Sequence, residues 1–304
     1  MNDYISVIMS CYNEKIKWIS ESIDSILNQT HKELELIIVL DNPENTEIYK
    51  LLKEKEDRDK RIRIFKNDKN IGLANSLNFA ISKCKYKYIA RMDADDIALP
   101  KRLEVQMKYL IENNADIVGA NCILIDEFDN IIGQSNYPIS SKQINSLLNY
   151  TNCLAHPTWL LRSDLYKVAN GYYSYNSAQD YDFLLRIKNK GFKIMNTPEV
   201  LLNYRKRASS IGSEKSLDQF QTAEYIRKMN RSKVYDVHCV KNFNNTKEDN
   251  FKFNKIIKFP LGIKLTSLRM FYEVTMIFKH KLGLRYFMYL YKSRICRWRI
   301  GGYK

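Results

Sequence analysis

The chain has 304 residues, of which 45% are hydrophobic and 27% are charged, a balance typical of folded globular proteins. No apolar run reaches the roughly 18 residues that predict a transmembrane helix. The N-terminus lacks the basic and apolar regions of a signal peptide. Its six cysteines are scattered without a CxxC pair, which favours reduced thiols over disulfides or a zinc site. We therefore expect a cytoplasmic protein.

The net charge of +15 is unevenly distributed along the chain. Residues 204–304 hold 23 Lys and Arg against 7 Asp and Glu, which leaves 26 against 27 for residues 1–203. Such asymmetry indicates binding to an anionic surface, either membrane lipid or nucleic acid.

The first 90 residues alternate between apolar runs and segments with helical spacing. The apolar runs, typical of buried strands, are residues 5–11, 34–40, 61–65 and 86–90. This alternation predicts an α/β fold with a mostly parallel, doubly wound sheet flanked by helices. Ligands of such sheets bind at the carboxyl ends of the strands. A dinucleotide cofactor is not expected, because the chain has no GxGxxG motif.

An acidic motif, Asp93-Ala94-Asp95-Asp96, follows the fourth apolar run. Carboxylates this close repel one another, but at the end of a buried strand they form a site for a hard divalent cation. The alternative is an acidic turn that caps the next helix, which we expect to carry Pro100 in its first turn.

Shorter elements are expected after the acidic motif. Residues 117–125 and 159–161 are predicted strands, and residues 126–133 resemble a turn between two strands. Residues 191–195 and 200–204 are predicted as two short closing strands. Before these closing strands, Asp180-Tyr181-Asp182 begins a helix, where a carboxylate is often merely a cap.

Taken together and in this order, the motifs resemble those of family 2 glycosyltransferases of the GT-A type. The matching segments are residues 6–14, residues 35–41, Asn70-Ile71-Gly72, Asp93-Ala94-Asp95-Asp96 and Gln179-Asp180. The resemblance covers roughly residues 3–210. It implies a nucleotide-sugar-binding and catalytic domain over residues 1–210, followed by a basic, mainly helical region over residues 211–304.

The resemblance also implies roles for individual residues. Asp41 would bind the uracil ring of a UDP-sugar, and Asp93 would contact ribose or metal. Asp95 would ligate Mn²⁺ or Mg²⁺ at the diphosphate, a role that Asp96 can share, and Asp180 would be the general base. The remaining residues expected at the nucleotide-sugar site are Tyr12, Glu14, Asn70, Gly72 and Ala94.

The chain departs from the family pattern in four places. The first strand ends in Ser10-Cys11 instead of Pro-Thr, Leu40-Asp41 replaces the usual Asp-Asp pair so that one aspartate is left, and Gln179 replaces a common Glu. Arg207 stands where the family often has a histidine. Arginine has no lone pair for a metal, but its charge can contact the pyrophosphate. The metal aspartates and the base are all retained.

Several of these residues have alternative interpretations. Asp41 can be a simple turn residue, and Asp182 is the alternative base. His156 can contact the acceptor or a phosphate, or make a structural hydrogen bond. The tyrosines at 172, 173 and 175 can form an acceptor-binding flap or ordinary loop packing.

One base and one metal suffice for a single in-line displacement, which predicts inversion at the sugar. We expect transfer of a hexose or N-acetylhexosamine to a glycan or lipid-linked acceptor of a bacterial surface polysaccharide, such as capsule, O-antigen or lipooligosaccharide. A sugar-phosphate nucleotidyltransferase is one alternative, although its glycine- and arginine-rich loop is missing near the N-terminus. A non-catalytic protein that binds membrane or nucleic acid is the other.

Residues 281–300 have the pattern of a basic amphipathic helix with an aromatic-containing apolar stripe. Such a helix is typical of an interfacial anchor on an anionic membrane, here the inner face of the cell membrane. The alternative is a helix that packs its stripe on the catalytic domain. Nucleic-acid binding is not expected, because no known motif accompanies the charge.

Overall fold

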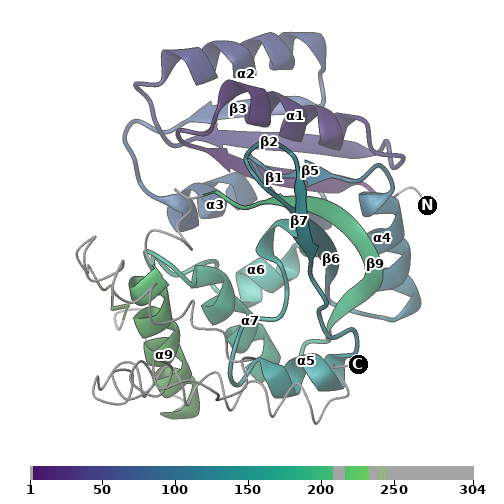
Figure 1. Cartoon of the computed structure of the whole chain (residues 1–304), viewed down its shortest axis with the longest axis vertical. Helices are drawn as coiled ribbons and strands as arrows, with labels where there is room; N and C mark the ends of the chain where they lie inside the picture. Colours follow the sequence, from purple (N-terminus) through teal and green to yellow (C-terminus); the bar gives the residue numbers. More distant parts are fainter. Residues whose placement is uncertain (1–2, 208–215, 233–239, 242, 244–304) are drawn as a thin grey trace, which may run out of the picture.

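The computed structural model of the chain describes residues 3–207, 216–232, 240, 241 and 243 (Figure 1). The helix expected over residues 281–300 lies outside these residues. The division at residue 210 stays a prediction, and Ser216–Ser232 (α9) is the helix described beyond it. Among the described residues, no helix combines the length and apolarity needed to cross a membrane.

The strands form one sheet in the order β3-β2-β1-β4-β8-β6-β9-β5, with β7 paired to β6. The first half is parallel: β1 (Ile5–Cys11), β2 (Leu34–Leu40), β3 (Ile62–Lys66) and β4 (Tyr88–Asp93). The second half is mixed: β5 (Ile97–Ala98), β6 (Ile117–Ile125), β7 (Ile131–Gln134), β8 (Leu160–Arg162) and β9 (Ile194–Arg205). The predicted α/β fold with a sheet flanked by helices is confirmed.

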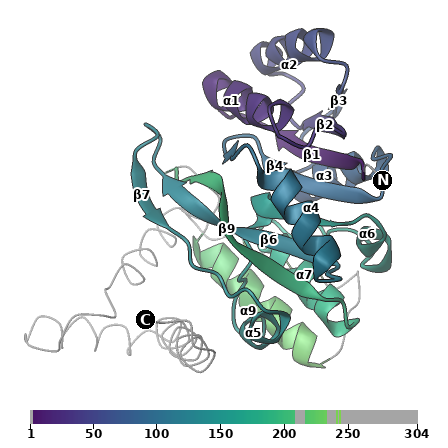
Figure 2. The same ribbon diagram turned by 90° about the vertical axis from the view of Figure 1, so that its right-hand side faces the viewer.

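Helices cover both faces of the sheet (Figures 1 and 2). One face packs against α1 (Ile16–Leu27), α2 (Thr46–Arg58) and α4 (Arg102–Glu112). The other face packs against α3 (Leu73–Ser82), α5 (Ser141–Leu147), α6 (Asp164–Val168), α7 (Gln179–Asn189) and α9. A short 3₁₀ helix, η1 (His156–Thr158), precedes β8.

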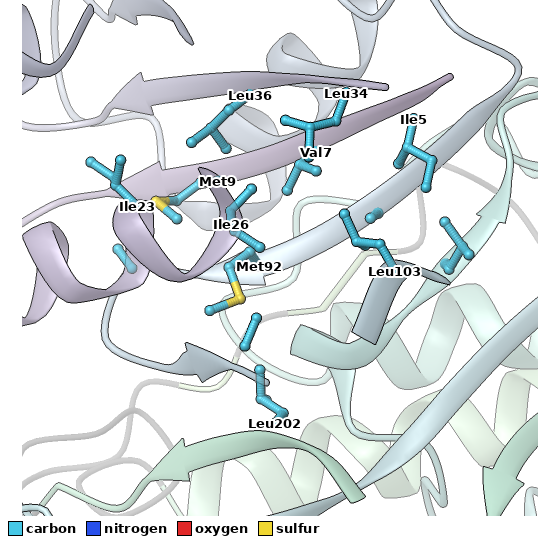
Figure 3. Packing of buried hydrophobic residues seen from close by; sticks show 14 of the residues in the cluster. Ile5, Val7, Met9, Ile23, Ile26, Leu34, Leu36, Met92, Leu103 and Leu202 are labelled. Atoms are coloured by element: carbon cyan, nitrogen blue, oxygen red, sulfur yellow. The ribbon is translucent and has the colours of Figure 1, made fainter. Parts of the chain in front are cut away.

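Because side chains alternate along each strand, the hydrophobic core consists of two clusters of buried residues, one on each face of the sheet. Val7 and Met9 of β1 point toward α1, where Ile23 and Ile26 cover them (Figure 3). Ile8, between them in sequence, belongs to the opposite cluster. Because successive side chains of a strand point to opposite faces, uninterrupted apolar runs suit strands that are covered on both sides.

Three boundaries differ from the sequence predictions. Strand β4 continues to Asp93, so the acidic motif begins inside the strand. Helix α4 begins at Arg102, which places Pro100 before the helix and not in its first turn. The two predicted closing strands are one strand, β9, because shifts in the β6–β9 register accommodate the residues that separate them.

Candidate active site

Three carboxylates gather where β4 ends. Ligand oxygens of Asp93, Asp95 and Asp96 all lie within 4.8 Å of one another. Burial and the charge of Asp93 raise the pKa of Asp95 to about 7. Burial and both neighbouring carboxylates raise the pKa of Asp96 well above its ordinary value. Mutual repulsion of this kind is relieved by a bound cation.

The donor set fits a divalent metal ion. Asp96 is 1% exposed, and its Oδ1 accepts the backbone N–H of Arg205 at 2.8 Å. Its Oδ2 is buried and has no hydrogen-bond partner among the described residues. Buried carboxylate oxygens are normally satisfied, and hard oxygen ligands are what Mg²⁺ and Mn²⁺ prefer. Asp96 therefore belongs with Asp93 and Asp95 as a candidate ligand.

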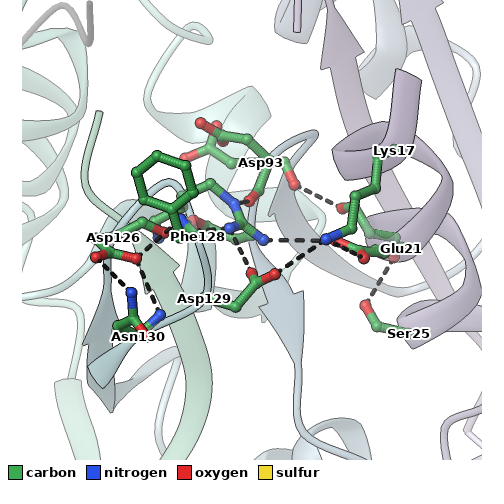
Figure 4. Close-up of polar contacts among 12 residues, drawn as sticks. Lys17, Glu21, Ser25, Asp93, Asp126, Phe128, Asp129 and Asn130 are labelled. Atoms are coloured by element: carbon green, nitrogen blue, oxygen red, sulfur yellow. Dashed lines mark hydrogen bonds and ion pairs between the residues drawn. The ribbon is translucent and has the colours of Figure 1, made fainter. Parts of the chain in front are cut away.

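Arg205, at the end of β9, joins this cluster to α1 and to the β6–β7 hairpin. Its Nε donates to the Asp95 carbonyl at 2.8 Å, and its guanidinium pairs with Asp129 and with Glu21 of α1. Asp129, at the tip of the β6–β7 hairpin, also pairs with Lys17 of α1 at 3.2 Å (Figure 4). The network fixes the acidic turn against α1 and the hairpin.

Arg207 lies against the acidic cluster from the same strand end. Its Nε is 2.7 Å from Asp95 Oδ2, and its Nη2 is 3.9 Å from Glu14 Oε1. The predicted residues Glu14, Asp95 and Arg207 are thus brought together. Ala94, between the aspartates, is buried. Tyr12 is 43% exposed, and its backbone N–H donates to Glu14 Oε2 at 2.7 Å.

Asp41 makes a separate cluster beyond the end of β2. Its carboxylate accepts hydrogen bonds from the Asn67 side chain at 2.7 Å and from the backbone N–H groups of Ile71 and Gly72 at 2.9 Å. Asn70 is exposed, and its side-chain oxygen accepts a hydrogen bond from the same Gly72 N–H at 3.0 Å. Asp41 therefore holds the Asn70-Ile71-Gly72 loop in place, and contact with a uracil ring stays a prediction.

Asp180 lies in the first turn of α7, where its Oδ2 accepts a hydrogen bond from Asn152 at 2.6 Å. Burial raises the pKa of Asp180 above its ordinary value. Backbone hydrogen bonding and the charge of Arg91 act in the opposite direction. A buried carboxylate with a raised pKa has the properties of a general base.

Arg91 connects the two groups of carboxylates electrostatically. Its side chain is 2% exposed and forms an ion pair with Asp93, two residues along β4. Its charge also favours the ionised forms of Asp95, Asp96 and Asp180. No role was predicted for Arg91, although a charged residue inside a buried apolar strand is itself a signal, because such a charge needs a partner.

Asp182 and His156 have structural partners. Asp182 is 2% exposed, and its Oδ2 accepts a hydrogen bond from Arg186 Nε at 2.8 Å. His156 Nε2 lies 2.8 Å from the hydroxyl of Tyr172, and burial lowers the pKa of this histidine well below its ordinary value. The contact of His156 matches its structural alternative, and a role of either residue toward the substrate stays a prediction.

Tyr172 and Tyr173, which follow α6, pack against side chains of α7. Tyr172 and Tyr175 are buried, and the ring of Tyr172 lies 5.2 Å from that of Phe183. The guanidinium of Arg186 lies 3.9 Å from the ring centre of Tyr173. The packing alternative therefore describes this segment.

The fold is that of GT-A glycosyltransferases. The crystal structure of S. aureus TarS 1-349 in complex with UDP-GlcNAc superposes with a TM-score of 0.57 at 18% identity, covering 86% of this chain and 76% of that one. The same protein in complex with UDP gives a TM-score of 0.58. At this level of identity the likeness concerns the fold.

Sequence comparison gives the family. The profile described as glycosyl transferase family 2 matches residues 6–168. The O-antigen biosynthesis glycosyltransferase WbnJ of Escherichia coli is 41% identical over 226 residues, or 73% of this chain and 87% of that protein. The amylovoran biosynthesis glycosyltransferase AmsE of Erwinia amylovora is 31% identical over 203 residues, or 66% of this chain and 75% of that protein. The chain belongs to glycosyl transferase family 2, and it is a glycosyltransferase.

Proposed function

We propose that the chain is an inverting, metal-dependent glycosyltransferase that moves a hexose or N-acetylhexosamine from a UDP-sugar to a hydroxyl of a glycan or lipid-linked acceptor. The observation that carries this proposal is the cluster of Asp93, Asp95 and Asp96 at the carboxyl end of β4. Parallel sheets bind ligands at this edge. The solved structures of TarS with UDP and UDP-GlcNAc support the choice of donor.

In this mechanism Asp95 would hold Mn²⁺ or Mg²⁺ together with Asp93 and Asp96. The cation would act as a Lewis acid on the departing diphosphate. Asp180 accepts the proton of the acceptor hydroxyl as that oxygen bonds to the anomeric carbon. The bond from the anomeric carbon to the diphosphate oxygen breaks in the same step, so UDP leaves and the configuration inverts.

Other residues position these groups. Asp41 keeps the Asn70-Ile71-Gly72 loop in place for the nucleotide, and Arg91 stabilises the charge of Asp93. Asn152 directs the Asp180 carboxylate through its hydrogen bond. Arg207 would contact the pyrophosphate, because charged hydrogen bonds from arginine suit phosphate oxygens.

We further propose that the enzyme acts in the synthesis of a bacterial surface polysaccharide, in the cytoplasm and on the inner face of the cell membrane. The names of WbnJ and AmsE, which refer to O-antigen and amylovoran, support the product class. The basic composition of residues 204–304 supports an anionic membrane as partner.

The test is release of UDP from a panel of UDP-sugars, with and without Mn²⁺. We expect one UDP-sugar to be hydrolysed slowly by the unmodified chain. Asp95→Ala should release no UDP, and Asp180→Asn should release UDP about 10²–10⁴-fold more slowly. Asp182→Asn is the matched control, since it neutralises a second aspartate on the same helix whose pKa is also raised by burial. It should destabilise the fold by leaving Arg186 unpaired, while turnover per folded molecule persists.

Two outcomes would count against the proposal. Loss of turnover in Asp182→Asn and not in Asp180→Asn would move the base to Asp182. Absence of UDP binding in calorimetric titrations with Mn²⁺ would remove the nucleotide-sugar function itself.

A further inference from the structure

Two arginines near the end of β9 contact the acidic cluster in different ways. Arg205 has no exposed side-chain surface, and carbonyl oxygens of Asp95 and Asp126 accept its N–H groups at 2.8 and 3.2 Å. The side chain of Arg207 is 20% exposed, and its nearest partner is the Asp95 carboxylate itself. Arg205 therefore has a structural role, since it holds the acidic turn in place. Arg207 instead pairs with the Asp95 carboxylate, which is also a proposed metal ligand.

The contact of Arg207 uses one oxygen of the candidate ligand. Its Nε lies 2.7 Å from Asp95 Oδ2. A divalent cation bound by Asp95 would stand a few ångströms from this guanidinium, and two positive charges at such a distance repel strongly in a partly buried site. The second anion near Arg207 is Glu14, whose Oε1 lies 3.9 Å from Arg207 Nη2.

We infer that Arg207 and the divalent cation compete for Asp95, so that binding of the cation displaces the guanidinium from the Asp95 carboxylate. This inference rests on the proposed function, because it assumes that Asp95 is a metal ligand. The displaced side chain keeps Glu14 within reach and becomes available to an anionic ligand. Arg207 thus lowers the affinity of the protein for the cation when no nucleotide is bound.

The test is calorimetric titration of the full chain with Mn²⁺ in the absence of nucleotide. We expect Arg207→Gln to bind Mn²⁺ roughly threefold or more tightly than the unmodified chain, since an ion pair no longer has to be broken. Lys206→Gln is the matched control: it removes the same charge from the adjacent, exposed residue, whose Nζ lies over the ring of Tyr204. Its Mn²⁺ affinity should be unchanged.

A second readout follows the arginine directly. The guanidinium of Arg207 lies 5.8 Å from the ring centre of Trp18, which is 4% exposed. Mg²⁺ should therefore change the fluorescence of Trp18, and the change should be smaller in Arg207→Gln. Trp18→Phe identifies the contribution of this tryptophan among the three in the chain.

The outcomes separate the inference from the function on which it rests. Equal or weaker Mn²⁺ binding by Arg207→Gln, or equal tightening by Lys206→Gln, would overturn the competition while leaving Asp95 as a ligand. Mn²⁺ binding that is the same in Asp95→Asn as in the unmodified chain would overturn the metal site, and the inference with it.

Discussion

Asp180 is the residue whose environment gives the clearest pH dependence. A general base works in its deprotonated form, and burial raises the pKa of Asp180. The kcat/KM value at saturating metal should therefore fall as the pH decreases through a pKa above the ordinary aspartate value of about 3.9. The measurement is a pH profile of donor hydrolysis, and an acid limb near pH ~4 would contradict the expectation.

The hydrogen bond from Asn152 to Asp180 allows a second test of the pH dependence. It stabilises the ionised form of Asp180, so Asn152→Ala should move the acid limb to higher pH. Asn149→Ala is the control, because the exposed Asn149 lies on the same segment and accepts a hydrogen bond from Lys188, whereas Asn152 donates one to Asp180.

Residues whose roles follow from local sequence were predictable, and those that act over long separations were not. Asp93, Asp95 and Asp96 lie within four positions at a strand end, so their clustering follows from the chain itself. Arg205 reaches Asp96 across 109 positions, and Asn152 reaches Asp180 across 28. Only the fold brings these pairs together. Asp41 was predicted as a ligand-binding residue, but its hydrogen bonds to a distant loop were not.

At the scale of elements, the turn into α3 depends on a glycine. Gly72 precedes α3 with φ +81° and ψ 160°, a region that residues with a side chain rarely occupy. An added Cβ there would meet no atom within 4 Å. Gly72→Ala should therefore cost about 1–3 kcal/mol in the free energy of unfolding, through backbone conformation and not through a clash.

Urea denaturation measures this cost, and Gly133→Ala in β7 is the control. At Gly133 an added Cβ would lie 3.6 Å from Leu124 Cδ1, an ordinary contact. UDP affinity should fall in Gly72→Ala as well, because the Gly72 N–H bonds to Asp41. Equal stability of the two variants would show that the turn tolerates alanine.

Element boundaries were less predictable than element types. Helix α5 was not predicted, although the capping box of Ser140 and Gln143 is a sequence signal for its N-terminus. Strand β5 has only two residues and exists because β9 pairs with it. Helix α9 is amphipathic and packs on α7, with Ile226 in the shared core. Short and partner-dependent elements carry little periodicity of their own.

For the whole molecule, ligands that bind the folded state should stabilise it against unfolding by mass action. If Mn²⁺ and UDP bind the folded chain, UDP at about 100 times its Kd adds about 2.7 kcal/mol to the free energy of unfolding. That corresponds to a rise in Tm of several degrees, at about 2–4 °C per kcal/mol for a domain of this size. A thermal melt with Mn²⁺, UDP or both, and with EDTA, measures the effect. EDTA and Asp95→Ala should each abolish the metal-dependent part, and an unchanged Tm would contradict the proposed site.

The pairing of Asp96 with Arg205 also has a consequence for protein synthesis. Strands β1 to β4 lie within the first 93 residues and can associate while the rest of the chain is still being translated. The acidic turn cannot pair with Arg205 until translation has added that residue, 109 positions after Asp96. At typical elongation rates this takes roughly 5–20 s. A nascent chain released before that point would carry three adjoining carboxylates without their covering strand. Truncated products should therefore be inactive, even when their N-terminal half-sheet has formed.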